Sequence, residues 1–132
     1  MKDFLLKPKG LVDITVISES GKTTTFKTNT VLPNAKKLIS HCIAGDSSFK
    51  VDILQVFKGS ALLASKTVQV SYPSDYKVRF TATFAGGEID SDLFNKAMLI
   101  NSVYGEFSIA QGFEVTINPT DKVSVGWEIT IL

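Results

Sequence analysis

The sequence predicts a mainly β protein, an antiparallel, jelly-roll-like β-sandwich with one short helix. Three observations lead to this fold class. Apolar and polar residues alternate most clearly in residues 77–84 and 123–131, and such a period of two buries one face of a strand and leaves the other in water. Only residues 34–44 show apolar spacing typical of a helix. Turn-forming Gly, Pro, Asn and Asp residues separate the apolar stretches.

The length of 132 residues fits one domain with its own core. We expect an N-terminal arm over residues 1–9 and a single sandwich over 10–132. The arm has too short an apolar run for a signal peptide and no small-residue cleavage site, which favours synthesis and folding in a cytosol. No apolar run approaches membrane-spanning length.

Charge is nearly balanced, with 14 Lys and Arg against 13 Asp and Glu and a net charge of +1. The only basic group is the mild cluster of Lys2, Lys7 and Lys9. We therefore expect neither nucleic acid nor an anionic membrane as a main partner. Cys42 is the single cysteine, so no intramolecular disulfide can form. Its place between Ile39 and Ile43 predicts a small core residue rather than a reactive thiol.

The first half of the chain predicts a hairpin and then the helix. Residues 11–17 and 23–27 are rich in β-branched side chains, and Gly21 suits the turn between them. After a connector over 29–32, Pro33 is placed where a first helical residue is expected. His41 lies on the flank of this helix and is interpreted as a surface or hydrogen-bonded histidine rather than a metal ligand.

The second half predicts further strands. Residues 49–57 form a strand with two apolar faces, residues 61–64 a short strand or a helical turn, and residues 67–72 another strand. The strand at 77–84 turns Val78, Phe80, Ala82 and Phe84 inward. Residues 88–95 predict a bulged edge or loop, and short strands follow at 98–100, 107–110 and 114–117. The last strand, 123–131, buries Trp127 against the sheet.

We expect no catalytic, cofactor-binding or metal-binding residues. Glu88, Asp90 and Asp92 have an every-other-residue spacing that could hold calcium, but a solvated turn whose carboxylates cap backbone amides is the preferred interpretation. Loop serines lack a partnering base, and the glycines show no phosphate-binding spacing. Three tyrosines could line a sugar-binding surface, although packing or interface roles are the preferred interpretation: Tyr72, Tyr76 and Tyr104.

A succession of short motifs runs through about three quarters of the chain. Its members are Asn29, Val31, Asn34, Ala35 and Ile39, then Phe80, Ala82, Phe84, Glu88, Leu93, Phe94, Asn95, Met98 and Leu99, and finally Asp121, Val125, Trp127, Ile129, Thr130 and Ile131. This succession resembles a family of small tailed-bacteriophage virion proteins, namely tail-fibre, head-fibre or neck-associated components. The chain departs from that pattern at residues 49–57, where the family usually has a Gly-rich segment.

The resemblance implies a non-enzymatic structural component of a virion, made in the host cytoplasm, that forms a homo-oligomer and contacts other virion proteins. The alternative is a carbohydrate- or protein-binding sandwich module of a bacterial surface. Self-association is also predicted from residues 49–57, because Leu54 and Val56 lie opposite Phe49, Val51, Ile53 and Phe57. We expect that second apolar set to need cover from the helix or from another chain.

Overall fold

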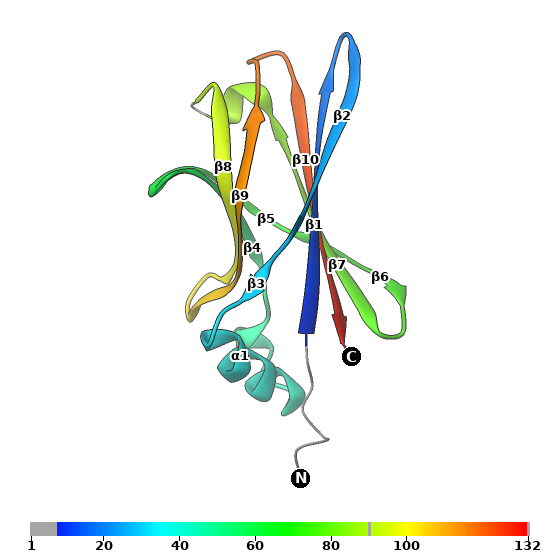
Figure 1. Cartoon of the computed structure of the whole chain (residues 1–132). Helices are drawn as coiled ribbons and strands as arrows, with labels where there is room; N and C mark the ends of the chain where they lie inside the picture. The colour runs from blue at the N-terminus through cyan, green and yellow to red at the C-terminus, as the bar shows by residue number, and fades with distance from the viewer. Residues whose placement is uncertain (1–7, 90, 132) are drawn as a thin grey trace.

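The computed structural model describes residues 8–89 and 91–131, which form two antiparallel five-stranded sheets packed face to face (Figure 1). The first sheet has the order β2 (Gly21–Thr28), β1 (Pro8–Ser18), β10 (Lys122–Ile131), β7 (Lys77–Ala85) and β6 (Gln69–Ser74). The second has the order β3 (Thr30–Val31), β9 (Gly105–Thr116), β8 (Leu93–Asn101), β4 (Ile53–Lys58) and β5 (Ala61–Thr67). The predicted β-sandwich with one short helix is confirmed.

Four of the eight strand pairings in the described residues are local hairpins, and β10 joins the two ends of the chain. Strand β10 lies between β1 and β7, so that Trp127 is paired with Val12 on one side and with Phe80 on the other. The first hairpin closes where Ser18 pairs with Gly21, whose φ of 134° suits glycine. The predicted hairpin at 11–27 is therefore confirmed.

The core lies between the two sheets and follows the predicted inward faces of the long strands. Trp127 has 0% exposure, and Phe84 on the neighbouring strand also has 0%. Phe80 and Ala82 are buried as well, while Val78 is partly buried at the margin of the core. The predicted facing of β7 and β10 is confirmed.

Helix α1 (Asn34–Ile43) confirms the predicted helix and lies across the lower end of the sandwich (Figure 1). It contacts β9 and the short 3₁₀ helix η2 (Ser47–Phe49) that follows it. Because the helix crosses the end of the sheets, only Ala35 and Leu38 are buried. The prediction that Cys42 is a core residue was wrong, since its side chain is exposed.

Strand β4 corrects the prediction that its second apolar face needs a partner. Leu54 and Val56 both have 0% exposure and belong to the core between the sheets. On the opposite face, Phe57 is half-buried beneath the Lys96 ammonium, whose nitrogen lies 4.5 Å from the ring centroid. The chain therefore covers Leu54 and Val56 itself, and those two residues no longer support self-association.

Strands β8 and β9 are longer than the sequence predicts. Leu93 already begins β8, a central strand between β9 and β4, so residues 93–95 are not a loop. The preceding residues do turn, and Gly86–Glu88 form the 3₁₀ helix η3. Strand β9 runs unbroken through the predicted gap after Ala110, with a register shift against β8 near Lys96 and a φ of 80° at Gly112.

The expected N-terminal arm over residues 1–9 overlaps the first strand. Strand β1 begins at Pro8, and residues 1–7 of the expected arm, with Lys2 and Lys7, lie outside the described residues. Within the described chain, the only helices are too short to cross a bilayer.

Candidate functional site

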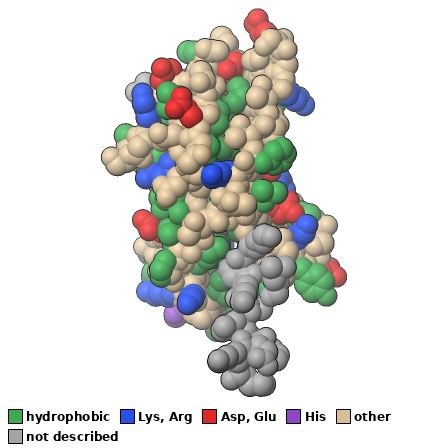
Figure 2. Space-filling model, in the orientation of Figure 1, with side chains coloured by type: hydrophobic (Ala, Val, Ile, Leu, Met, Phe, Trp, Pro, Cys, Tyr) green, Lys and Arg blue, Asp and Glu red, His purple; other side chains and the backbone are tan. Residues whose placement is uncertain are grey.

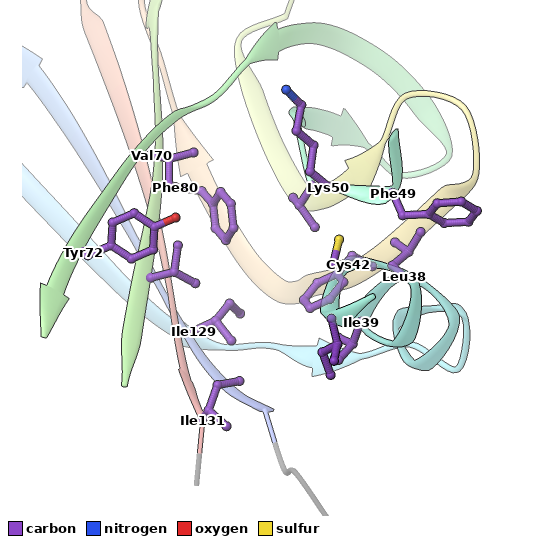
Figure 3. A pocket seen from close by; sticks show the side chains of 14 residues that line it. Leu38, Ile39, Cys42, Phe49, Lys50, Val70, Tyr72, Phe80, Ile129 and Ile131 are labelled. Carbon is purple, nitrogen blue, oxygen red and sulfur yellow. The ribbon is translucent and has the colours of Figure 1, made fainter. Parts of the chain in front are cut away.

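An apolar groove lies between α1 and the inner face of the first sheet, with a volume of ≈580 Å³ (Figure 3). We call this space the groove. Its helix wall consists of Leu38, Ile39, Cys42 and Ile43, extended by the segment Phe49–Val51. Its sheet wall consists of Val70 and Tyr72 from β6, Val78 and Phe80 from β7, and Ile129 and Ile131 from β10.

The groove exists because only part of the apolar face of α1 is buried in the core. Leu38 is buried, but Ile43, five residues further along the helix, is 71% exposed. Opposite the helix, the first sheet continues past the core and leaves Tyr72 76% exposed. Two apolar walls thus face each other without filling the space between them.

The lining offers almost no charge. Lys50 is the only charged residue among the described side chains that line the groove, and Figure 3 shows its ammonium directed away from the helix. Partial desolvation raises the pKa of the Cys42 thiol above its ordinary value, and the Asp46 carboxylate raises it further. The groove is therefore suited to an apolar occupant rather than to an ion or to thiolate chemistry.

Strand β6 borders the groove and forms one edge of the first sheet. All six of its residues are exposed, and it pairs only with β7 in the described part of the chain. A register shift between Ser71 and Ser74, together with Pro73, disturbs its second half. Its first four residues, Gln69–Tyr72, therefore offer backbone groups that another strand could pair with.

The helix side of the site carries an aromatic stack. The His41 ring lies on Phe49 with centroids 4.0 Å apart, and Phe49 lies on Tyr104 at 3.9 Å. Tyr104 is thus a packing residue, in agreement with the preferred interpretation of the sequence. His41 is an exposed surface residue that stacks on an aromatic ring. Tyr72 and Tyr76 are 76% and 72% exposed and remain accessible to a partner.

The described members of the acidic group, Glu88 and Asp92, lie in the connection between β7 and β8. Glu88 contacts Lys66 at 2.9 Å and accepts a hydrogen bond from the Ala85 amide at 3.1 Å. The Lys66 hydrogen bond, aided by that amide, lowers the pKa of Glu88. Asp92 lies 3.6 Å from Lys58, and Asp90 is outside the described residues. Amide capping by Glu88 confirms part of the preferred interpretation.

A second surface pocket, also of ≈580 Å³, is lined by Gly59 and by residues of β8 and β9. Figure 2 shows acidic and basic side chains interspersed on one face, with hydrophobic side chains between them. No group of three metal-ligating side chains occurs in residues 8–89 and 91–131.

The fold and the groove define a β-sandwich protein with an open apolar groove beside an edge strand. No known protein family, curated protein or solved structure matches the chain. The sequence did not predict the groove, because α1 and the sheet residues that face it are far apart along the chain. The one usable signal was the long stripe of α1, which continues through Ile39, Cys42 and Ile43 after Leu38.

Proposed function

We propose that the chain is a non-enzymatic structural component of a tailed-phage virion, a fibre, collar or neck-associated protein. It acts by self-association and by docking on a larger assembly. The resemblance of its motif succession to small virion proteins supports this function. The observation that carries the self-association is the exposed edge strand β6 beside an apolar surface.

Pairing along an edge strand combines backbone hydrogen bonds with side-chain burial. A strand from a second copy that pairs with Gln69–Tyr72 would satisfy the backbone groups that face away from β7. The same contact would cover Val70 and Tyr72, which are 49% and 76% exposed. Apolar side chains beside an open edge are the combination that favours association.

Sedimentation over a range of concentrations tests this surface. The wild-type chain is expected to associate, and Tyr72→Lys is expected to be monomeric because it places a charge at the pairing edge. Phe26→Lys makes the same kind of change on the other edge of the sheet, where Phe26 is 66% exposed, and is expected to associate like the wild type. A wild-type monomer at every concentration would contradict the proposed surface.

The virion assignment needs its own experiment. The chain is expected in purified phage particles, and its sandwich is expected to fit density in the tail, neck or head. Particles that lack the chain would contradict the assignment whatever its oligomeric state.

A second function, a carbohydrate- or protein-binding module of a bacterial surface, is favoured by the exposed rings of Tyr72 and Tyr76. Such rings can stack on sugar faces. Under this alternative, Tyr76→Ala would abolish retention on a glycan array. Tyr104→Ala is the control, because the Tyr104 ring already stacks on Phe49.

A further inference from the structure

The first described residue of the chain lies at the end of the groove. Strand β1 begins at Pro8, and Pro8 pairs with Ile131, which lines the groove. The next inward pair is Gly10 with Ile129, another lining residue. The segment 1–7 therefore joins the fold beside the β10 side of the groove, at the end opposite β6.

The sequence of this segment matches the surface it adjoins. It reads Met1-Lys2-Asp3-Phe4-Leu5-Leu6-Lys7, with three consecutive apolar residues. The residue before a proline favours extended conformations, and Lys7 precedes Pro8, the first residue of β1. In an extended chain, Phe4 and Leu6 share the face of Val12 and Ile14, which are both fully buried, whereas Leu5 falls on the opposite face with the exposed Leu11.

We propose that Phe4 and Leu6 of the chain's own N-terminal segment occupy the groove at its β10 end. They enter between Ile131 of the sheet wall and Ile39 of α1, two side chains that approach the same space in Figure 3. An extended chain spans about 3.3–3.6 Å per residue, so Leu6 stays within about 7 Å of Pro8 and Phe4 within about 14 Å. Both side chains can reach the end of the groove from this attachment point.

The same chain is a better occupant than a second copy because it is tethered at the groove. Only Lys7 separates Leu6 from Pro8, a strand position paired with the lining residue Ile131. A tether this short gives a far higher effective concentration than a second molecule in dilute solution. Removing Phe4, Leu6 and the groove walls from water supplies the driving force. The inference is independent of any role in a virion.

Cys42 provides a reporter for this occupancy, because it lines the groove and is the single cysteine of the chain. The alkylation rate of Cys42 is measured in the native full-length protein at fixed pH. Phe4→Ser combined with Leu6→Ser is expected to raise the rate several-fold by uncovering the groove. Leu5→Ser is the matched control and is expected to keep the wild-type rate. Equal rates in all three proteins would overturn the proposal.

A cross-link distinguishes the occupant's origin. Leu6→Cys adds a second thiol, and a short bismaleimide is expected to join it to Cys42 within one molecule at low protein concentration. Cross-linked dimers whose yield rises with concentration, without the intramolecular product, would assign the groove to the segment of a second copy and overturn the proposal. Failure to form either product would also overturn it.

Discussion

Arg79 and Asp13 form a bidentate ion pair that passes over the middle of β10, where Gly126 lies between them. The Nη1–Oδ2 and Nη2–Oδ1 distances are 2.8 and 2.9 Å. Asp13 on β1 pairs with Gly126 in the strand register. The hydrogen bond to Asp13 raises the pKa of Arg79, and the charges of Asp13 and Glu128 add to this effect against partial desolvation. Three strands of the first sheet are thus joined on its outer face.

Gly126→Ala is expected to destabilise the protein by about 1–2 kcal/mol, because its methyl group would displace one of these partners. A Cβ at this position would collide with the guanidinium of Arg79 and would lie 2.8 Å from Asp13 Oδ1. Arg79 can move aside, but only by giving up the bidentate geometry. Urea unfolding followed by circular dichroism measures the change.

The control for this substitution is Gly87→Ala in the same protein. Apart from its chain neighbours, the nearest atom to a Cβ on Gly87 would be the Pro119 carbonyl oxygen at 3.9 Å, so little change is expected. In an Asp13→Ala background, most of the Gly126→Ala effect should also disappear. Equal losses with and without Asp13 would show that the ion pair is not the cause.

Trp127→Ala is expected to cost about 3–5 kcal/mol of unfolding free energy, since it empties the largest fully buried side chain of the core. Phe26→Ala removes an aromatic ring that is 66% exposed and is expected to have a much smaller effect. Far-UV circular dichroism should follow both variants, because Trp127 is the only tryptophan. A loss below about 1 kcal/mol for Trp127→Ala would contradict its central position.

Glu88→Gln is expected to lower the melting temperature slightly at neutral pH and to lose this effect in acid. The folded pKa of Glu88 lies below the usual value because Lys66 donates to its carboxylate. Its contribution is therefore present above an unfolded pKa of about 4.3 and is lost as the pH falls through the lower folded pKa. Glu19→Gln in the exposed β1–β2 turn makes the same charge change. A melting difference for Glu88→Gln that does not vary with pH would contradict the role of the Lys66 contact.

Calcium is expected to leave the melting temperature unchanged. Glu88 is engaged by Lys66 and the Ala85 amide, and Asp92 lies near Lys58. Binding a cation would require breaking these contacts for an incomplete set of oxygen ligands. A rise in melting temperature on adding calcium, reversed by a chelator, would show that the acidic turn is a metal site.

The sequence predicted the elements whose side chains alternate over many residues. Strands β7 and β10 lie between neighbours in one sheet and are buried on a single face, so their inward residues could be assigned directly. The strand predicted over 49–57 is correct only from Ile53 onward, since Ser47–Phe49 form η2 instead. Even there, periodicity does not say which of two apolar faces meets the core. Leu54 and Val56 were assigned to the face that needs a partner, and the second sheet placed them in the core.

The site was less accessible to sequence reasoning because it depends on how far each element extends. The spacing of Ile39, Cys42 and Ile43 predicts an apolar helix face, but it cannot show that the helix crosses the end of a sheet. The start of β8 at Leu93 was missed for a related reason, since polar residues before it resemble a loop. The position of α1 and the start of β8 both depend on contacts with segments that are distant in the chain.

The pairing of β1 with β10 also governs how the chain can fold during synthesis. Residues that meet in this seam, such as Val12 and Trp127, are separated by nearly the whole described chain. Until β10 emerges from the ribosome, β1 and β7 both present unpaired edges where the centre of the sheet will form. Folding of the first sheet is therefore expected to be slow and to follow synthesis. A chain truncated before Lys122 would leave the edges of β1 and β7 unpaired and open to pairing with other chains.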